Sequence, residues 1–228
     1  VYNLAVEGMF YAGGLCSALV ATLMSMGAGI HAVTALLIGA IAGSLVAFIP
    51  AILKLKFEAN EIVSSLMLNY IVFFVGDYLL KTYMKDAKST HVVSLRFKET
   101  AKLIRFSKGI HFGLVIAIVL LVVAYVFLYH TRWGYAIRMC GENKRFAKYS
   151  GIGVTSTILL SQIIGGALAG LGASLLFQTG YEQWQCTYSS VPAMGFNGIA
   201  AAFLGGLSPI GSIFASFFIQ HITAGGAY

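Results

Sequence analysis

The sequence predicts an all-α, polytopic membrane protein with about six spans or part-spans. Only 10% of the 228 residues are charged and 58% are hydrophobic, whereas about 25% of residues are charged in soluble domains. Several apolar runs reach the roughly 20 residues that a membrane-spanning helix needs. The 26 glycines fit closely packed membrane helices, in which small residues let backbones approach.

The apolar runs define the expected helices. Glu7 is the one acidic or basic residue in 1–53, and a break near residue 27 divides this run into helices at about 8–26 and 31–53. Further spans are expected at 62–80, 110–130 and 153–181. The last run, 196–228, is interrupted before Pro209. Because Ser208 suits an N-cap and proline suits the first helical position, we expect one half-helix to end near Gly205 and another to start at Pro209. Broken membrane helices usually line a buried or watery cavity.

Two polar segments separate these spans. Residues 81–109 are about a third Lys, Arg, Asp and Glu and are too polar to cross a membrane. Residues 131–152 are basic and amphipathic. Together with Lys54 and Lys56, the second segment places seven Lys and Arg on one side, whereas 81–109 places eight on the other. This count slightly favours 81–109 as the cytoplasmic side and does not settle the orientation.

Small and polar side chains within the spans are expected to have structural roles. Gly39 and Gly43 form a small-xxx-small pair, and Gly166 and Gly170 share one face of their span; the alternative is that glycines recur by chance in a glycine-rich chain. No metal or redox spacing links the cysteines, which are expected to pack as small side chains: Cys16, Cys140 and Cys186. Three histidines at span borders are expected to be interfacial polar groups rather than metal ligands: His31, His111 and His130.

Five motifs in sequence order resemble a known family. They are Asn3-Leu-Ala-Val-Glu7-Gly8, Ser65-Leu-Met-Leu-Asn69-Tyr70-Ile71, Arg138-Met-Cys-Gly141-Glu142-Asn143 with Ala147-Lys-Tyr149-Ser-Gly151-Ile152, Gly166–Ala173 and Gly195–Ala201. The chain resembles the membrane permease subunits of ATP-driven (ABC) importers of the simple-sugar and nucleoside type. It is similar to ribose permeases and nearest the nucleoside subgroup. The resemblance implies one transmembrane permease domain over 1–228, truncated at both ends.

The resemblance implies that 131–152 is a cytoplasmic coupling loop and 81–109 an extracytoplasmic loop. A coupling helix within 138–152 would sit in a groove of the ATPase subunit. The basic side chains suit an acidic groove, and Tyr149 and Ile152 supply anchors. The family commonly has Pro and Ala after Asn143, where this chain has Lys144, Arg145 and Phe146. The alternative is a basic, lipid-facing loop without a partner. The expected coupling residues are Arg138, Gly141, Glu142, Asn143, Arg145, Ala147, Tyr149 and Gly151.

A second group of residues is expected to line the substrate path. An acidic residue at the edge of a span is a functional hypothesis by default, so Glu7 and Asn3 are expected to bind ribose hydroxyls or a base edge; alternatively, Glu7 caps a helix N-terminus at the interface. Asn69 either contacts substrate or joins two helices by a hydrogen bond. Phe196 and Asn197 either stack on and hydrogen-bond a planar base or pack ordinarily.

The resulting functional hypothesis is a multi-pass permease subunit of the cell membrane that imports nucleosides or related simple sugars. Its expected partners are a cytoplasmic ATP-binding subunit, an extracytoplasmic substrate-binding lipoprotein, which would dock near Tyr181, Trp184 and Tyr188, and a second permease subunit. No phosphate-binding P-loop is present, so ATP would be used by the partner subunit; no cofactor and no enzymatic activity are expected in this chain. The net charge of +7 suits anionic lipid headgroups rather than nucleic acid.

Two other functional classes remain as alternatives. The first is a stand-alone secondary transporter or channel for small polar solutes. The second is a membrane-embedded enzyme, for which the spans show no convergent catalytic set. Among importers, the resemblance leaves nucleosides, nucleobases and pentoses open as substrates, and homodimers and heterodimers open as assemblies.

Overall fold

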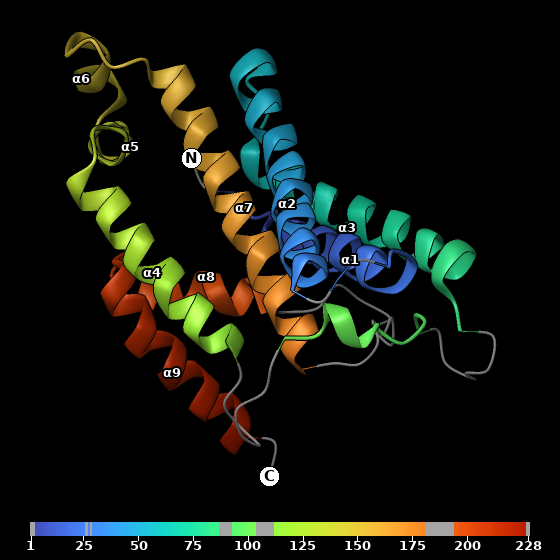
Figure 1. Cartoon of the computed structure of the whole chain (residues 1–228). Helices are drawn as coiled ribbons and strands as arrows, with labels where there is room; N and C mark the ends of the chain where they lie inside the picture. The colour runs from blue at the N-terminus through green and yellow to red at the C-terminus, as the bar shows by residue number, and fades with distance from the viewer. Residues whose placement is uncertain are drawn as a thin grey trace.

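The computed structural model describes residues 3–25, 27, 29–86, 93–103, 112–180 and 194–226, which are predominantly helical. Five segments are long and apolar enough to cross a membrane, and the predicted all-α polytopic fold is confirmed. The elements are α1 (Val6–Leu23), α2 (Ile30–Phe57), α3 (Glu61–Leu79), the π-helical turn η1 (Leu80–Met84), the 3₁₀ turn η2 (Glu99–Ala101), α4 (Phe112–His130), α5 (Arg132–Glu142), α6 (Lys144–Tyr149), α7 (Val154–Gly180), α8 (Met194–Leu204) and α9 (Pro209–Gly225) (Figure 1).

Glycines allow α1, α2 and α7 to pack against one another at the centre of the bundle. A Cβ atom built on Gly13 would collide with the Cα of Gly170, and one built on Gly43 would collide with the carbonyl oxygen of Gly166. The three backbones therefore touch where a larger side chain would hold them apart. The predicted packing role of the glycine pairs in α2 and α7 is confirmed.

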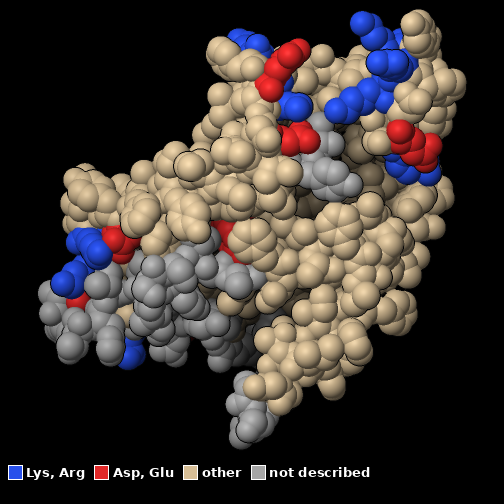
Figure 2. Space-filling view, turned by 180° about the vertical axis from the view of Figure 1, so that it is seen from behind, with Lys and Arg blue, Asp and Glu red and all other residues tan. Residues whose placement is uncertain are grey.

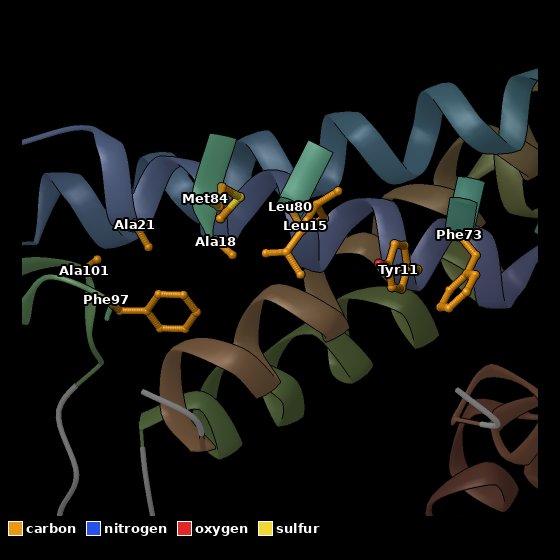
Figure 3. Close-up of a cluster of buried hydrophobic side chains, with 9 residues drawn as sticks. All are labelled: Tyr11, Leu15, Ala18, Ala21, Phe73, Leu80, Met84, Phe97 and Ala101. Atoms are coloured by element: carbon orange, nitrogen blue, oxygen red, sulfur yellow. The ribbon is translucent and has the colours of Figure 1, made fainter. Parts of the chain in front are cut away.

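A cluster of buried side chains joins α1 to α3, η1 and the segment around η2 (Figure 3). Phe97 and Ala101 come from that segment and reach the cluster from outside the long helices. Aromatic rings add to the packing, because Tyr11 and Phe73 lie with their centroids 5.3 Å apart. The described part of 81–109 is thus attached to the helices by apolar burial.

His31, expected at a span border, lies at the start of α2 and is buried within the protein. It is 0% exposed. Its Nε2 lies 2.9 Å from the carbonyl oxygen of Val20, and its Nδ1 lies 2.8 Å from Thr100 Oγ1. Since a carbonyl only accepts hydrogen bonds, Nε2 is the donor. The segment that carries Thr100 covers the start of α2. The residues next to His31 in the sequence do not indicate this tertiary contact. His130 is exposed at the end of α4.

Helix α2 continues further than the apolar pattern predicts. The helix expected at about 31–53 extends to Phe57 and includes Lys54 and Lys56, whose positive charges suit a helix C-terminus. The next residue, Glu58, has a φ of 52°. Helix α3 agrees with the span expected at 62–80, and η1 follows it to Met84. Asp77 of α3 pairs with Lys81 one turn later at 2.5 Å.

The predicted break in the last apolar run is confirmed. Helix α8 ends one residue before Gly205, and α9 begins at Pro209. The Ser208 hydroxyl accepts a hydrogen bond from the Gly211 N–H at 3.4 Å, as expected of an N-cap. Gly206 has a φ of +65° and so closes α8 in the left-handed conformation that glycine adopts easily. The two helices leave this turn in different directions (Figure 1).

Most charged side chains gather toward the ends of the molecule, and few lie between them (Figure 2). One end carries α5, α6 and the last turn of α2, which lie together at the top of Figure 1. The other end carries η1 and the described part of 81–109. The two polar segments of the sequence therefore lie at opposite ends of the spans. Tyr181, Trp184, Tyr188, Cys186 and His111 lie outside the described residues.

Candidate functional site

Glu7 is a buried acidic residue in the first turn of α1. Its side chain is 1% exposed. Its Oε1 accepts hydrogen bonds from the backbone N–H groups of Gly195 at 2.8 Å and Phe196 at 3.1 Å. These amides belong to the first turn of α8, where a helix supplies no backbone partner. Glu7 therefore caps the N-terminus of another helix, and its Oε2 finds no partner within the described part of the chain.

Asn69 joins α3 to the beginning of α1. Its side chain is 2% exposed. Its Oδ1 accepts a hydrogen bond from the Gly8 N–H at 2.8 Å, and its Nδ2 donates one to the Leu4 carbonyl at 2.9 Å. Asn69 thus uses its acceptor and its donor on the same short stretch of backbone. The sequence left two roles open for Asn69, contact with substrate and a hydrogen bond between helices, and these bonds correspond to the second.

Asn3 extends these contacts to α7. Its Nδ2 donates to Gln162 Oε1 at 2.7 Å, and its Oδ1 accepts from the Ala5 N–H at 2.9 Å. Ser65 accepts from the Leu4 N–H at 3.3 Å. We call Asn3, Glu7, Ser65, Asn69 and Gln162 the polar cluster. It connects α1, α3, α7 and α8 around the beginning of α1.

Phe196 and Asn197 lie at the edge of the polar cluster. Phe196 meets Glu7 through its backbone N–H, while its side chain is 40% exposed. Asn197 is exposed on α8. The structure thus brings together Asn3, Glu7 and Asn69, and it places the other two expected path residues on the surface of the helix that Glu7 caps.

The basic segment between α4 and α7 consists of two helices. Thr131 caps α5, because its Oγ1 accepts from the Gly134 N–H at 3.1 Å. Asn143 caps α6, because its Oδ1 accepts from the N–H groups of Arg145 at 3.0 Å and Phe146 at 3.1 Å. Asn143 is extended (φ −150°, ψ 105°) and divides the segment, so 138–152 contains the end of α5 and the whole of α6.

Gly151 ends α6 by a Schellman motif. Its φ is +78°. Its N–H donates to the Lys148 carbonyl at 3.1 Å, and the Ile152 N–H donates to the Ala147 carbonyl at 3.0 Å. This pair of bonds is the motif's signature, and glycine meets its conformational requirement without strain. The position of Gly151 is explained by helix termination.

We call α5 and α6 together the α5–α6 segment, and its outer surface is basic and aromatic. Tyr149 is 91% exposed, and the Arg138 guanidinium lies 4.8 Å from the centroid of the Tyr129 ring, within cation–π range. A Cβ atom built on Gly141 would meet nothing within 4 Å. Ala147 is buried and packs inward. The remaining expected coupling residues are exposed: Glu142, Asn143 and Arg145.

Two cavities lie between the α5–α6 segment and α7. One is basic, with Lys144, Arg145 and Lys148 in its wall beside the first residues of α7. The other lies beneath Cys140 and extends along α7 to Gln162. Because Gln162 also accepts a hydrogen bond from Asn3, this second cavity lies between the α5–α6 segment and the polar cluster.

Sequence reasoning missed three residues of the site: Ser65 as a partner of the α1 backbone, Gln162 and Gly195. An uncharged amide inside an apolar run is a signal for Gln162, since such a side chain seeks a partner between helices. Gly195 has no local signal, because its importance comes from its contact with α1. Among the described residues, no group of three or more His, Cys, Asp or Glu is placed to hold a metal ion.

The fold and these two regions define a class of protein: a multi-pass helical membrane protein with a polar cluster among its spans and an exposed basic segment at one end. The permease component family of the branched-chain amino acid transport system matches residues 1–228. The chain belongs to this family and is a multi-pass protein of the cell membrane.

Several curated relatives are transporter permeases. The guanosine ABC transporter permease protein of Bacillus subtilis is 30% identical over 99% of this chain and 66% of its own length. The nucleoside ABC transporter permease protein NupB of Lactococcus lactis is 32% identical over 83% of this chain and 54% of its own length. The glucose ABC transporter permease protein of Haloferax volcanii is 28% identical over 100% of this chain and 62% of its own length. The chain thus spans less than two thirds of these relatives, and no solved structure matches it.

Proposed function

We propose that the chain forms the membrane path of an ATP-driven importer for nucleosides or related simple sugars. The observation that carries this proposal is the similarity to guanosine and nucleoside permeases over most of the chain. These relatives are permease subunits rather than enzymes. In this proposal, a separate cytoplasmic subunit uses ATP, an extracytoplasmic lipoprotein delivers the substrate, and a second permease subunit completes the path.

The substrate path runs past the beginning of α1 and α8 in this proposal. It includes Asn3, Glu7, Asn69, Phe196 and Asn197. The exposed Asn197 amide suits the hydroxyl and N–H groups of a nucleoside, and an exposed aromatic ring suits its planar base. Glu7 and Asn69 are buried, Asn3 is partly buried, and Phe196 and Asn197 are exposed, an arrangement that supports a path wall with an exposed aromatic side chain at its edge.

The α5–α6 segment is the proposed contact for the ATP-binding subunit, at the cytoplasmic end of the spans. Residues 81–109 then lie at the extracytoplasmic end. Exposure of an aromatic side chain beside several cations supports a docking role, because aromatic and basic anchors are common at protein interfaces. The proposed contact residues are Arg138, Gly141, Glu142, Asn143, Arg145, Tyr149 and Gly151; Ala147, also expected there, is buried and supports the segment from inside.

Uptake of labelled nucleoside into vesicles tests the proposal. The vesicles contain the complete permease with its ATP-binding subunit and receptor. We expect uptake that requires ATP and that is lost in Glu142→Lys or Gly141→Trp, while the receptor still binds substrate. Uptake without ATP would instead indicate a stand-alone transporter or channel. Full ATP-driven uptake in both variants would contradict docking at the α5–α6 segment.

A further inference from the structure

Helix α8 takes its N-terminal cap from a residue distant in the sequence. A helix start is usually capped by the side chain of the preceding residue, which bonds the second or third helical amide. The residue before α8 is Ala193, whose side chain has no hydrogen-bonding atom. The second and third amides, of Gly195 and Phe196, bond to Glu7 Oε1 instead. The carboxylate also suits the positive end of the helix dipole.

The first turn of α8 lies directly against the backbone of α1. A Cβ atom built on Gly195 would lie 2.9 Å from the Glu7 nitrogen and 3.1 Å from the Val6 carbonyl carbon. Real Cβ atoms are essentially never found within 3.0 Å of a backbone atom, so a residue larger than glycine would push α8 and α1 apart. The cap and the close approach therefore fix α8 at the same point.

Glu7 and Asn69 are equally buried, but they hold different elements. Both Asn69 hydrogen bonds end on the backbone near the start of α1. Both hydrogen bonds that the Glu7 carboxylate accepts come from α8, and its Oε2 has no partner in the described residues. The structure thus offers two buried polar side chains that can be removed separately, one of which holds α8.

We infer that Glu7 is a positioning residue, which sets the place of α8 and of the Phe196 and Asn197 side chains on it. Within the proposed path, Glu7 then acts on substrate through α8 rather than by direct contact. This role rests on the proposed function only where it concerns transport. The anchoring of α8 is a property of the protein itself and is measurable without substrate.

A distance measurement between spin labels tests the anchor in the complete protein. The labels are placed at Leu204→Cys on α8 and Leu37→Cys on α2, both exposed, after Cys16, Cys140 and Cys186 are replaced by serine. We expect one narrow distance population in the parent protein. Glu7→Ala should add a second, shifted population. Glu7→Gln should keep the single population of the parent protein, because the glutamine side-chain oxygen can still accept hydrogen bonds from both N–H groups. Asn69→Ala, the matched control, should leave the α8 distance unchanged.

Three results would overturn the anchor: an unchanged distance in Glu7→Ala, a similar shift in Asn69→Ala, or a Glu7→Gln variant that behaves like Glu7→Ala. A transport measurement addresses the second part of the inference. Gly195→Ala adds a methyl group that displaces α8 but cannot hydrogen-bond to substrate. We therefore expect it to raise the KM for nucleoside uptake, as Glu7→Ala does. If KM rises in Glu7→Ala but not in Gly195→Ala, Glu7 contacts the substrate directly and is not a positioning residue. If the distances shift as expected but the parent protein transports nothing, the anchor stands and the proposed function fails.

Discussion

The polar cluster and the α5–α6 segment are built in opposite ways. The cluster joins residues far apart in the sequence, such as Glu7 and Gly195, 188 positions apart. The segment is shaped by bonds over two or three residues, such as those of Asn143. The cluster is largely buried, whereas most residues of the segment are exposed. The comparison teaches that the first region belongs to the tertiary fold, whereas the second can change its surface without changing the fold.

Adding bulk to one glycine in each region should give the largest contrast. Gly195→Leu would press against α1 and should destabilise the protein by about 3 kcal/mol, the upper end of overpacking costs. Gly141→Leu enters open space and should change stability by less than about 0.5 kcal/mol. Thermal unfolding of both variants in the same detergent measures the difference. Equal unfolding temperatures would show that α8 does not press on α1 as described.

Removal of a buried amide should have the next largest effect. Asn69→Leu leaves the Gly8 N–H and the Leu4 carbonyl without their partner, and unpaired buried groups cost about 2 kcal/mol. We expect the unfolding temperature to fall clearly. Asn197→Leu is the matched control, because Asn197 is exposed, and it should unfold like the parent. A stable Asn69→Leu variant would mean that the hydrogen bonds at the start of α1 contribute little.

Removal of a local cap should cost less. Asn143→Ala deprives α6 of its cap, with an expected loss of about 1 kcal/mol. The effect should be confined to α6, so hydrogen exchange of the Arg145 and Phe146 amides should accelerate while exchange in α7 stays constant. Asn143→Asp retains an accepting oxygen and should exchange like the parent. Faster exchange throughout α7 would indicate that α6 supports the bundle.

Substitution on the outer surface of the α5–α6 segment should affect stability least. Tyr149→Ser removes a side chain that is 91% exposed, and the free energy of unfolding should change by less than about 0.5 kcal/mol. If the segment docks as proposed, the same variant should still lower ATP-driven uptake. A large loss of stability would place Tyr149 in the fold and weaken the contrast between the two regions.

Local chemistry in the sequence predicts much of this structure. Ser208 and Pro209 predict the break between α8 and α9, and paired glycines predict the crossing of α2 and α7. Asn143 is also a good N-cap by residue type. The sequence does not predict features that depend on a partner far away along the chain. The burial of His31 requires the segment with Thr100, and the cap on α8 requires the fold to bring Glu7 to it.

Photo-crosslinking tests the central claim, that the α5–α6 segment contacts the ATP-binding subunit, most directly. A benzoyl-phenylalanine is incorporated at Tyr149 in the complete permease, expressed with its ATP-binding subunit. A second sample carries the same group at Leu37, which is exposed on α2. The account predicts a covalent adduct with the ATP-binding subunit from position 149 and none from position 37. The absence of an adduct from position 149, in a complex that still transports substrate, would contradict it.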